Sequence, residues 1–125
     1  MSRAHDGLRR RRAMLYMLMI CDDESVILNP AEVHALPQIQ AWDAEVDGRG
    51  IRRGGARLRP SSDATTIRVR GGEVLVSDGP FAETKEQMGG FDIIECATLD
   101  EAVEIAARHP AAASGAIEVR PLWPE

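Results

Sequence analysis

The order of its strand-like and helix-like segments is the feature that most limits how this 125-residue chain can fold. Four strands are expected in chain order, over residues 15–21, 51–58, 91–96 and 116–120. The first, third and fourth have the apolar or alternating pattern of β-strands, whereas Gly54-Gly55 weakens the second. One helix is expected between the first two of these strands and another between the last two. This βαββαβ order predicts the split βαβ, ferredoxin-like arrangement, an α+β fold with an antiparallel sheet.

Local signals at the helix ends support this order. Asn29 and Glu32 have the spacing of a capping box at the start of the first helix. Pro37 lies inside that helix and should kink or interrupt it, because proline removes a backbone hydrogen bond. Thr98 and Glu101 repeat the capping pattern at the start of the second helix.

A β-hairpin is expected as an insertion before the third strand of the sheet. Residues 65–70 and 73–77 have strand character and flank Gly71-Gly72. Glycine tolerates the positive φ that two-residue hairpin turns require. The two sequence segments therefore predict adjacent antiparallel strands.

The predicted sheet has helices for only one of its faces. The sequence offers no third helix to cover the other face, and an apolar sheet face needs a cover. A second subunit that packs sheet against sheet is the economical solution. The chain is therefore expected to form a homodimer through the open sheet face.

Charge and composition limit the partners of the chain. Residues 1–13 hold five Arg and one Asp, which leaves ten basic and nineteen acidic residues in 14–125. The expected organisation is a disordered basic tail over 1–13 and one domain over 14–125. The acidity of this domain argues against nucleic acid and anionic membranes as partners. The apolar run at 15–21 is too short for a signal peptide, so a cytoplasmic protein is expected.

A polar stretch between two predicted strands is the candidate binding region. It runs from Asp78-Gly79-Pro80-Phe81 to Gly89-Gly90 and shows neither helical nor strand periodicity up to residue 87. Loops held between strands commonly carry binding groups. The predicted ligand-binding residues are Gly79, Pro80, Phe81, Glu83, Thr84, Glu86, Gly89 and Gly90.

Asp78 and Lys85 are the candidate catalytic residues of this stretch. Asp78 could act as a general base if burial raised its pKa. Lys85, the only lysine of the chain, could stabilise an anionic oxygen or an enolate. The alternative is structural: Asp78 would bond backbone amides of its own turn, and Lys85 would pair with Glu83 or Glu86.

Two arginines have two interpretations each, and the two cysteines have one. Arg57 and Arg59 could line the same cleft or form a solvated strand face. Cys21 and Cys96 each end an apolar run, where a buried free thiol is the expected state. No histidine pair has ligand spacing and no glycine-rich phosphate loop precedes a helix, so neither a metal nor a cofactor is expected.

The residues from Val76 to Phe91 resemble the signature of the DGPF-type branch of the YCII-related family. The likeness continues through Thr98-Leu99-Asp100-Glu101-Ala102 and Ile117-Glu118-Val119-Arg120-Pro121 and covers about residues 14–122. The resemblance implies the dimeric α/β-barrel form of the ferredoxin-like fold.

The resemblance also implies two kinds of function. Members related to YCII carry a His–Asp pair proposed as catalytic, whereas some DGPF-type members occur beside or fused to sigma-factor-like regulators. This chain departs from the His–Asp pattern: His5 lies in the tail and His34 near the start of the first helix. His109 follows the second helix, where a partial negative charge favours a capping role.

The expected function is therefore a small-molecule-binding, enzyme-like domain of lyase or hydrolase type. Its cleft should lie near the Asp78-Gly79-Pro80-Phe81 loop. The alternative is a non-catalytic ligand-binding or regulatory module linked to transcription.

Overall fold

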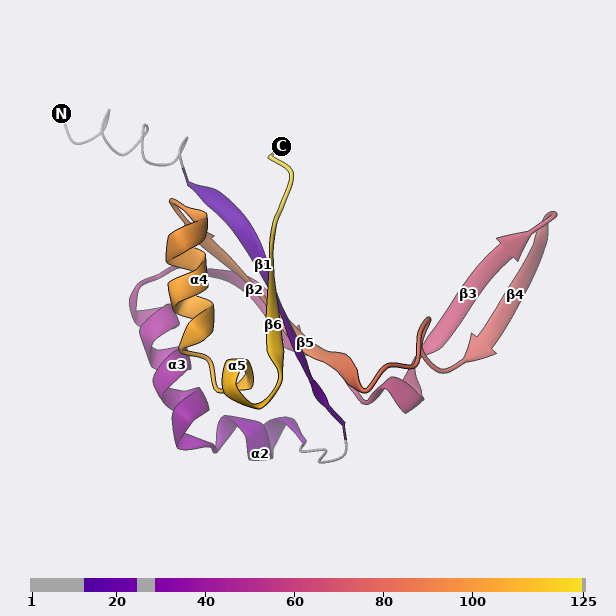
Figure 1. Ribbon diagram of the computed structural model, residues 1–125, viewed down its shortest axis with the longest axis horizontal. Helices are drawn as coiled ribbons and strands as arrows, with labels where there is room; N and C mark the ends of the chain where they lie inside the picture. The colour runs from indigo at the N-terminus through magenta and orange to yellow at the C-terminus, as the bar shows by residue number, and fades with distance from the viewer. Residues whose placement is uncertain (1–12, 25–28, 125) are drawn as a thin grey trace.

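A four-stranded antiparallel sheet forms the centre of the computed structural model, which describes residues 13–24 and 29–124 (Figure 1). Its strands are β1 (Met14–Asp23), β2 (Arg52–Arg57), β5 (Glu86–Cys96) and β6 (Ala116–Pro121). Their order across the sheet is β2-β5-β1-β6, which confirms the α+β, ferredoxin-like prediction. Residues 1–12, which include most of the predicted basic tail, lie outside the described residues.

The helices lie to one side of this sheet (Figure 1). They are α2 (Pro30–His34), α3 (Pro37–Gly48), α4 (Leu99–Ala107) and the short α5 (Ala111–Ser114), which the sequence did not predict. The predicted interruption at Pro37 is confirmed, because this residue starts α3. The capping box at α2 is confirmed too: Glu32 N donates to Asn29 Oδ1 at 2.8 Å and Asn29 N donates to Glu32 Oε1.

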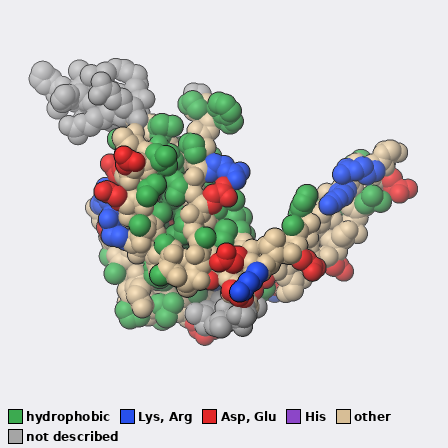
Figure 2. Space-filling view, in the orientation of Figure 1, with side chains coloured by type: hydrophobic (Ala, Val, Ile, Leu, Met, Phe, Trp, Pro, Cys, Tyr) green, Lys and Arg blue, Asp and Glu red, His purple; other side chains and the backbone are tan. Residues whose placement is uncertain are grey.

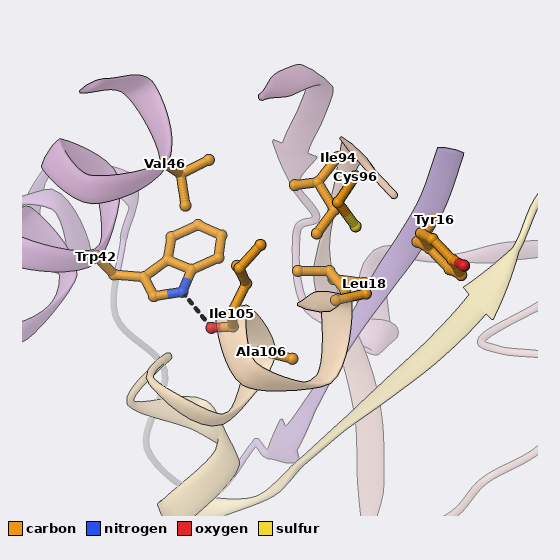
Figure 3. Close-up of a cluster of buried hydrophobic side chains, with 9 residues drawn as sticks. Tyr16, Leu18, Trp42, Val46, Ile94, Cys96, Ile105 and Ala106 are labelled. Atoms are coloured by element: carbon orange, nitrogen blue, oxygen red, sulfur yellow. Dashed lines mark hydrogen bonds between the residues drawn. The ribbon is translucent and has the colours of Figure 1, made fainter. Parts of the chain in front are cut away.

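The core fills the space between the sheet and helices α3 and α4 (Figure 3). Leu18 and Ile94 from the two central strands are fully buried there, as are Val46 and Ile105 from the helices. The indole N–H of Trp42 donates to the backbone carbonyl of Ile105 at 2.9 Å, which joins α3 to α4. This buried hydrogen bond fixes the orientation of a side chain that also borders the candidate site.

The two cysteines are free thiols. Cys96 is buried in the core, as predicted, whereas the prediction of burial is wrong for Cys21, which is partly exposed near the end of β1. Burial raises the pKa of the Cys96 thiol to about 11, so this side chain stays protonated and behaves as a small hydrophobic residue.

The opposite face of the sheet has no helix over it among the described elements. Strand alternation turns Leu15, Met17 and Met19 of β1 away from Tyr16 and Leu18, which belong to the core. Leu15 is 39% exposed. A single chain therefore leaves this sheet open, and closure into a dimeric barrel stays a prediction.

The predicted hairpin is confirmed as a separate two-stranded sheet of β3 (Thr65–Arg70) and β4 (Glu73–Asp78). Gly71 and Gly72 make its turn with φ of 57° and 79°, where glycine is the favoured residue. A short 3-10 helix, η1 (Ser61–Asp63), leads into it. Figure 1 shows the hairpin projecting away from the rest of the molecule.

The last part of the predicted polar loop is instead strand. β5 begins at Glu86 rather than at Phe91 because its first residues pair with the end of β1, as in the pair Asp23↔Glu86. A register irregularity after Ile20 accompanies this extension. Polar residues and glycines are poor strand formers, so only the pairing partner reveals this segment as a strand.

Truncating Ile94 to Ala should lower the free energy of unfolding by about 2–5 kcal/mol, because a buried side chain leaves a cavity. Ile93 is its neighbour on the opposite face of β5 and serves as the matched control. Ile93→Ala should cost less than half as much in urea titrations. Equal losses, measured at a protein concentration where the chain is monomeric, would contradict the assignment of the core to the helix-bearing face.

Candidate functional site

The main cleft lies between the sheet and the helices near α2, α5 and η1. It has a volume of about 790 Å³. Ile20, Val33 and Ile39 give it apolar walls from β1, α2 and α3. A mostly apolar, concave site with a few polar groups is the usual form of a small-molecule pocket.

A smaller cavity of about 200 Å³ adjoins the main cleft. The two share Ile20, Val33, Ile39, Arg57 and His109 as lining residues. The smaller cavity is also lined by Asp43, Arg52 and Asp92 of the polar cluster described next. The two adjoining cavities are treated together as the candidate site.

A guanidinium with three carboxylate partners forms the floor of the smaller cavity. Arg52 of β2 donates from Nη1 to Asp92 at 2.5 Å, from Nη2 to Asp43 at 2.6 Å and from Nε to Asp47 at 2.9 Å. Its guanidinium carbon also lies 5.5 Å from the ring centre of Trp42. The cluster would carry two net negative charges if all three carboxyls were ionised, so one of them retains a proton more readily.

Asp92 is the carboxyl of this cluster whose pKa is raised by burial. It is 7% exposed, and this burial, together with the charges of Asp43 and Asp47, raises its pKa to about 6 although Arg52 opposes the shift. Oδ1 accepts the Arg52 hydrogen bond, whereas Oδ2 has no partner among the described residues. No fully buried polar side-chain atom of the described residues lacks a partner, so Oδ2 keeps some accessible surface, and Asp92 lines the smaller cavity.

His109 lines both cavities and is 8% exposed. Its Nδ1 accepts a hydrogen bond from Ala111 N at 3.0 Å, and its ring packs edge-on against Trp42 at 4.7 Å. Burial lowers the pKa of His109, with Asp43 opposing and Arg57 adding to the shift. The ring is therefore neutral at pH 7, with its proton on Nε2.

His109 follows α4, where the sequence placed it. Its side chain does not cap that helix, because Nδ1 instead accepts from the first residue of α5. His34 lies at the rim of the smaller cavity, where its Nδ1 is 3.9 Å from Asp43. The structure thus brings His109 to the site and leaves His34 at its edge.

The Asp78-Gly79-Pro80-Phe81 turn lies at the base of the hairpin. Gly79 has φ of 97°, donates its N–H to Ala64 O at 2.8 Å and accepts from Thr66 Oγ1. Asp78 is exposed and its carboxylate has no hydrogen-bond partner among the described residues. Phe81 is 78% exposed. None of Gly79, Pro80, Phe81 and Glu83 lines the main cleft, the smaller cavity or a further depression beside β6.

The rest of the predicted stretch divides between separate places. Thr84, Lys85 and Glu86 border a depression beside β6, and Lys85 makes no ion pair with the described residues. Gly89 lines the main cleft and Gly90 the smaller cavity. The catalytic and binding roles assigned to this stretch from sequence stay predictions.

Arg57 joins the two cavities, which answers one question that the sequence left open. Both Arg57 and Arg59 line the main cleft. Arg59 is largely solvated and pairs with Asp63 at 2.9 Å. Arg57 has no carboxylate partner among the described residues and lies close enough to His109 to influence its pKa. It is therefore a cation available to a ligand.

Sequence reasoning missed Arg52 and Asp92. One signal was present, because Asp92 stands between the apolar residues Phe91 and Ile93 and shares its strand face with Ile94 and Cys96. A carboxylate at a core-facing strand position needs a partner or a raised pKa. Its partner comes from a different strand, and that pairing is a property of the tertiary structure.

Comparison with known proteins agrees with the fold. The family model for the YCII-related domain matches residues 14–125 of the chain. The chain belongs to the YCII-related family. A similar protein is the uncharacterised protein R00369 of Rhizobium meliloti (strain 1021). It is 40% identical over an alignment of 126 positions that covers 87% of this chain and 92% of that protein. Membership of the DGPF-type branch stays a prediction.

Neither a membrane-spanning helix nor a metal-binding group of side chains is seen in the part of the chain that the structure describes. No helix there is long and apolar enough to cross a membrane. No group of three or more His, Cys, Asp or Glu side chains within that part is placed to hold a metal ion.

Replacing Asp92 by Asn should change how stability depends on pH. The pKa of about 6 lies above the ordinary 3.8, so the wild-type folded state holds its proton more tightly and gains stability as the pH falls from 7 to 5. The variant lacks this proton. Between pH 7 and pH 5, the unfolding free energy of the wild type should therefore rise by about 1 kcal/mol relative to that of the variant. Urea titrations at both pH values measure it, and an unchanged difference would contradict the raised pKa.

Proposed function

We propose that this YCII-related protein binds a small organic molecule in the two adjoining cavities and catalyses a proton transfer on it. The observation that carries the proposal is the pairing of Asp92 and His109 in one cavity. One is a carboxyl whose pKa is raised to about 6, and the other is a neutral imidazole. Groups with perturbed pKa values in a cleft are candidates for acid–base catalysis.

The geometry supports a division of roles between these residues. Asp92 lines the smaller cavity, and its carboxyl can take up or give a proton near neutral pH. His109 keeps its proton on Nε2 and can donate a hydrogen bond to a carbonyl or other oxygen of the ligand. Arg57 can stabilise the negative charge that develops on that oxygen. This chemistry suits a lyase or a hydrolase.

The cleft extends the earlier expectation of a site near the Asp78-Gly79-Pro80-Phe81 loop. Gly89 and Gly90, at the end of that stretch, line the cavities, while Asp78 and Lys85 do not border either of these two. Asp78 and Lys85 remain the competing candidates for catalysis, and variants can separate the two sites.

Exchange of hydrogen for deuterium at carbon tests the proposal without a known substrate. A panel of small ketones and esters in D₂O, followed by NMR, reports proton abstraction next to a carbonyl. Asp92→Asn and His109→Gln should each lower the rate for an active compound by about 10²-fold or more, because positioned acid–base groups contribute on that scale. Thermal melting of each variant shows whether it has folded.

Asp78→Asn is the matched control, since it makes the same change at an exposed carboxylate. It should keep the wild-type rate if the site lies in the cleft. Full activity of both Asp92→Asn and His109→Gln would sink the proposal, and loss in Asp78→Asn alone would return the site to the loop. Binding without exchange or hydrolysis would favour the alternative of a ligand-binding or regulatory module.

We further propose that the partner of this chain is a second copy, joined through the open sheet face. Leu15, Met17 and Met19 supply apolar surface there. Light scattering at micromolar concentration should give about twice the 13.7 kDa of one chain. A mass near 13.7 kDa would contradict the dimer.

A further inference from the structure

The β3–β4 hairpin, residues 65–78, is an arm that the body of its own chain does not cover. It forms a sheet of its own, separate from the four-stranded sheet. Figure 1 shows it standing clear of the helices and of the main sheet. Figure 2 shows hydrophobic side chains at the surface of the projecting arm, alongside charged ones.

One face of the arm is entirely aliphatic along its central part. The cross-strand pairs Ile67↔Val76 and Val69↔Val74 place four side chains on the same face. Their exposed fractions lie between 55% and 63%. The arm is therefore an amphipathic ribbon whose apolar side meets solvent in the single chain.

The other face of the arm is different in character. Arg68 pairs with Leu75 there, and its guanidinium lies 5.0 Å from the ring centre of Phe81. Leu75, at 40% exposed, is the least exposed aliphatic residue of the arm. Contacts within the chain thus partly cover this face and leave the aliphatic face to another partner.

An arm of this kind needs a cover. A two-stranded hairpin by itself is marginally stable in water. Burying an aliphatic side chain stabilises a protein roughly in proportion to the apolar area removed from water, so four exposed ones represent a large unused driving force. Their sequence is also well suited to strand, with β-branched residues at each aliphatic position.

We infer that the aliphatic face of the arm packs against a second copy of this chain. A stable interface buries about 800 Å² on each partner, more than four aliphatic side chains supply, so the arm must act together with another apolar surface. The chain has one, the open face of its main sheet. Both surfaces face outward in one chain. A second copy related by a two-fold axis can cover both surfaces of the first chain while its own two surfaces are covered in turn.

Charge is consistent with this occupant. The arm carries Arg68 and Arg70 against Glu73 and Asp78 and is therefore neutral, whereas residues 14–125 as a whole hold ten basic and nineteen acidic side chains. A neutral arm can approach an acidic body without the repulsion that two acidic surfaces would meet. The inference concerns assembly and stands apart from the catalytic proposal.

The test compares the two faces of one strand. Val74→Lys/Val76→Lys places charges on the aliphatic face, and Leu75→Lys makes the same change on the opposite face. All three positions are exposed in the single chain, so the variants should fold, which circular dichroism and thermal melting can check. Sedimentation equilibrium should show the dimer dissociation constant raised at least tenfold in the double variant, with Leu75→Lys close to wild type.

Three outcomes would overturn the inference. Wild-type chains that stay monomeric at micromolar concentration would remove the second copy as occupant. Equal dissociation constants for the double variant and Leu75→Lys would show that the aliphatic face makes no contact. A dimer that is lost in Met17→Lys but unaffected in the double variant would assign the interface to the main sheet alone. None of these results bears on the Asp92 and His109 chemistry, which the exchange assay tests.

Discussion

A single guanidinium connects the elements that surround the candidate site. Arg52 begins β2 at the edge of the sheet, and its three nitrogens each meet a different carboxylate, from Asp92 on β5 and from Asp43 and Asp47 on α3. The contacts hold α3 against the sheet beside the cavity. Burial raises the pKa of Asp92 to about 6. The single positive charge of Arg52 does not offset this, because it is shared among three carboxylates. The ion cluster that positions the helix thereby also sets the pKa on which the proposed acid–base chemistry depends.

Trp42 belongs to the core and also contacts residues of the candidate site. Its indole is buried among core side chains and bonded to Ile105, while its ring contacts both His109 and Arg52. Packing of this kind restricts the rotamers of all three side chains, as a catalytic site requires. Stability and function therefore depend on the same residue, and substitutions of Trp42 would not separate them.

The single chain leaves two apolar surfaces without a cover, the open face of the sheet and the arm. Both follow from the βαββαβ order, which places helices on one side only and lets an insertion between β2 and β5 extend beyond the sheet. Since soluble proteins seldom expose such surfaces without use, assembly is the simplest physical explanation for both. The candidate cleft opens near η1, directly before the arm, so assembly and ligand access involve neighbouring segments.

The sequence by itself determined the elements and their order. Apolar periodicity, the cap at Asn29, the break at Pro37 and the Gly71-Gly72 turn act over a few residues, so each could be recognised locally. The tertiary structure decided what those patterns could not. Glu86 to Gly90 became strand because the end of β1 was available to pair with it. Asp92, Arg52 and His109, far apart along the chain, became one site because burial and charge act through space, and those distances exist only after the sheet and helices have packed.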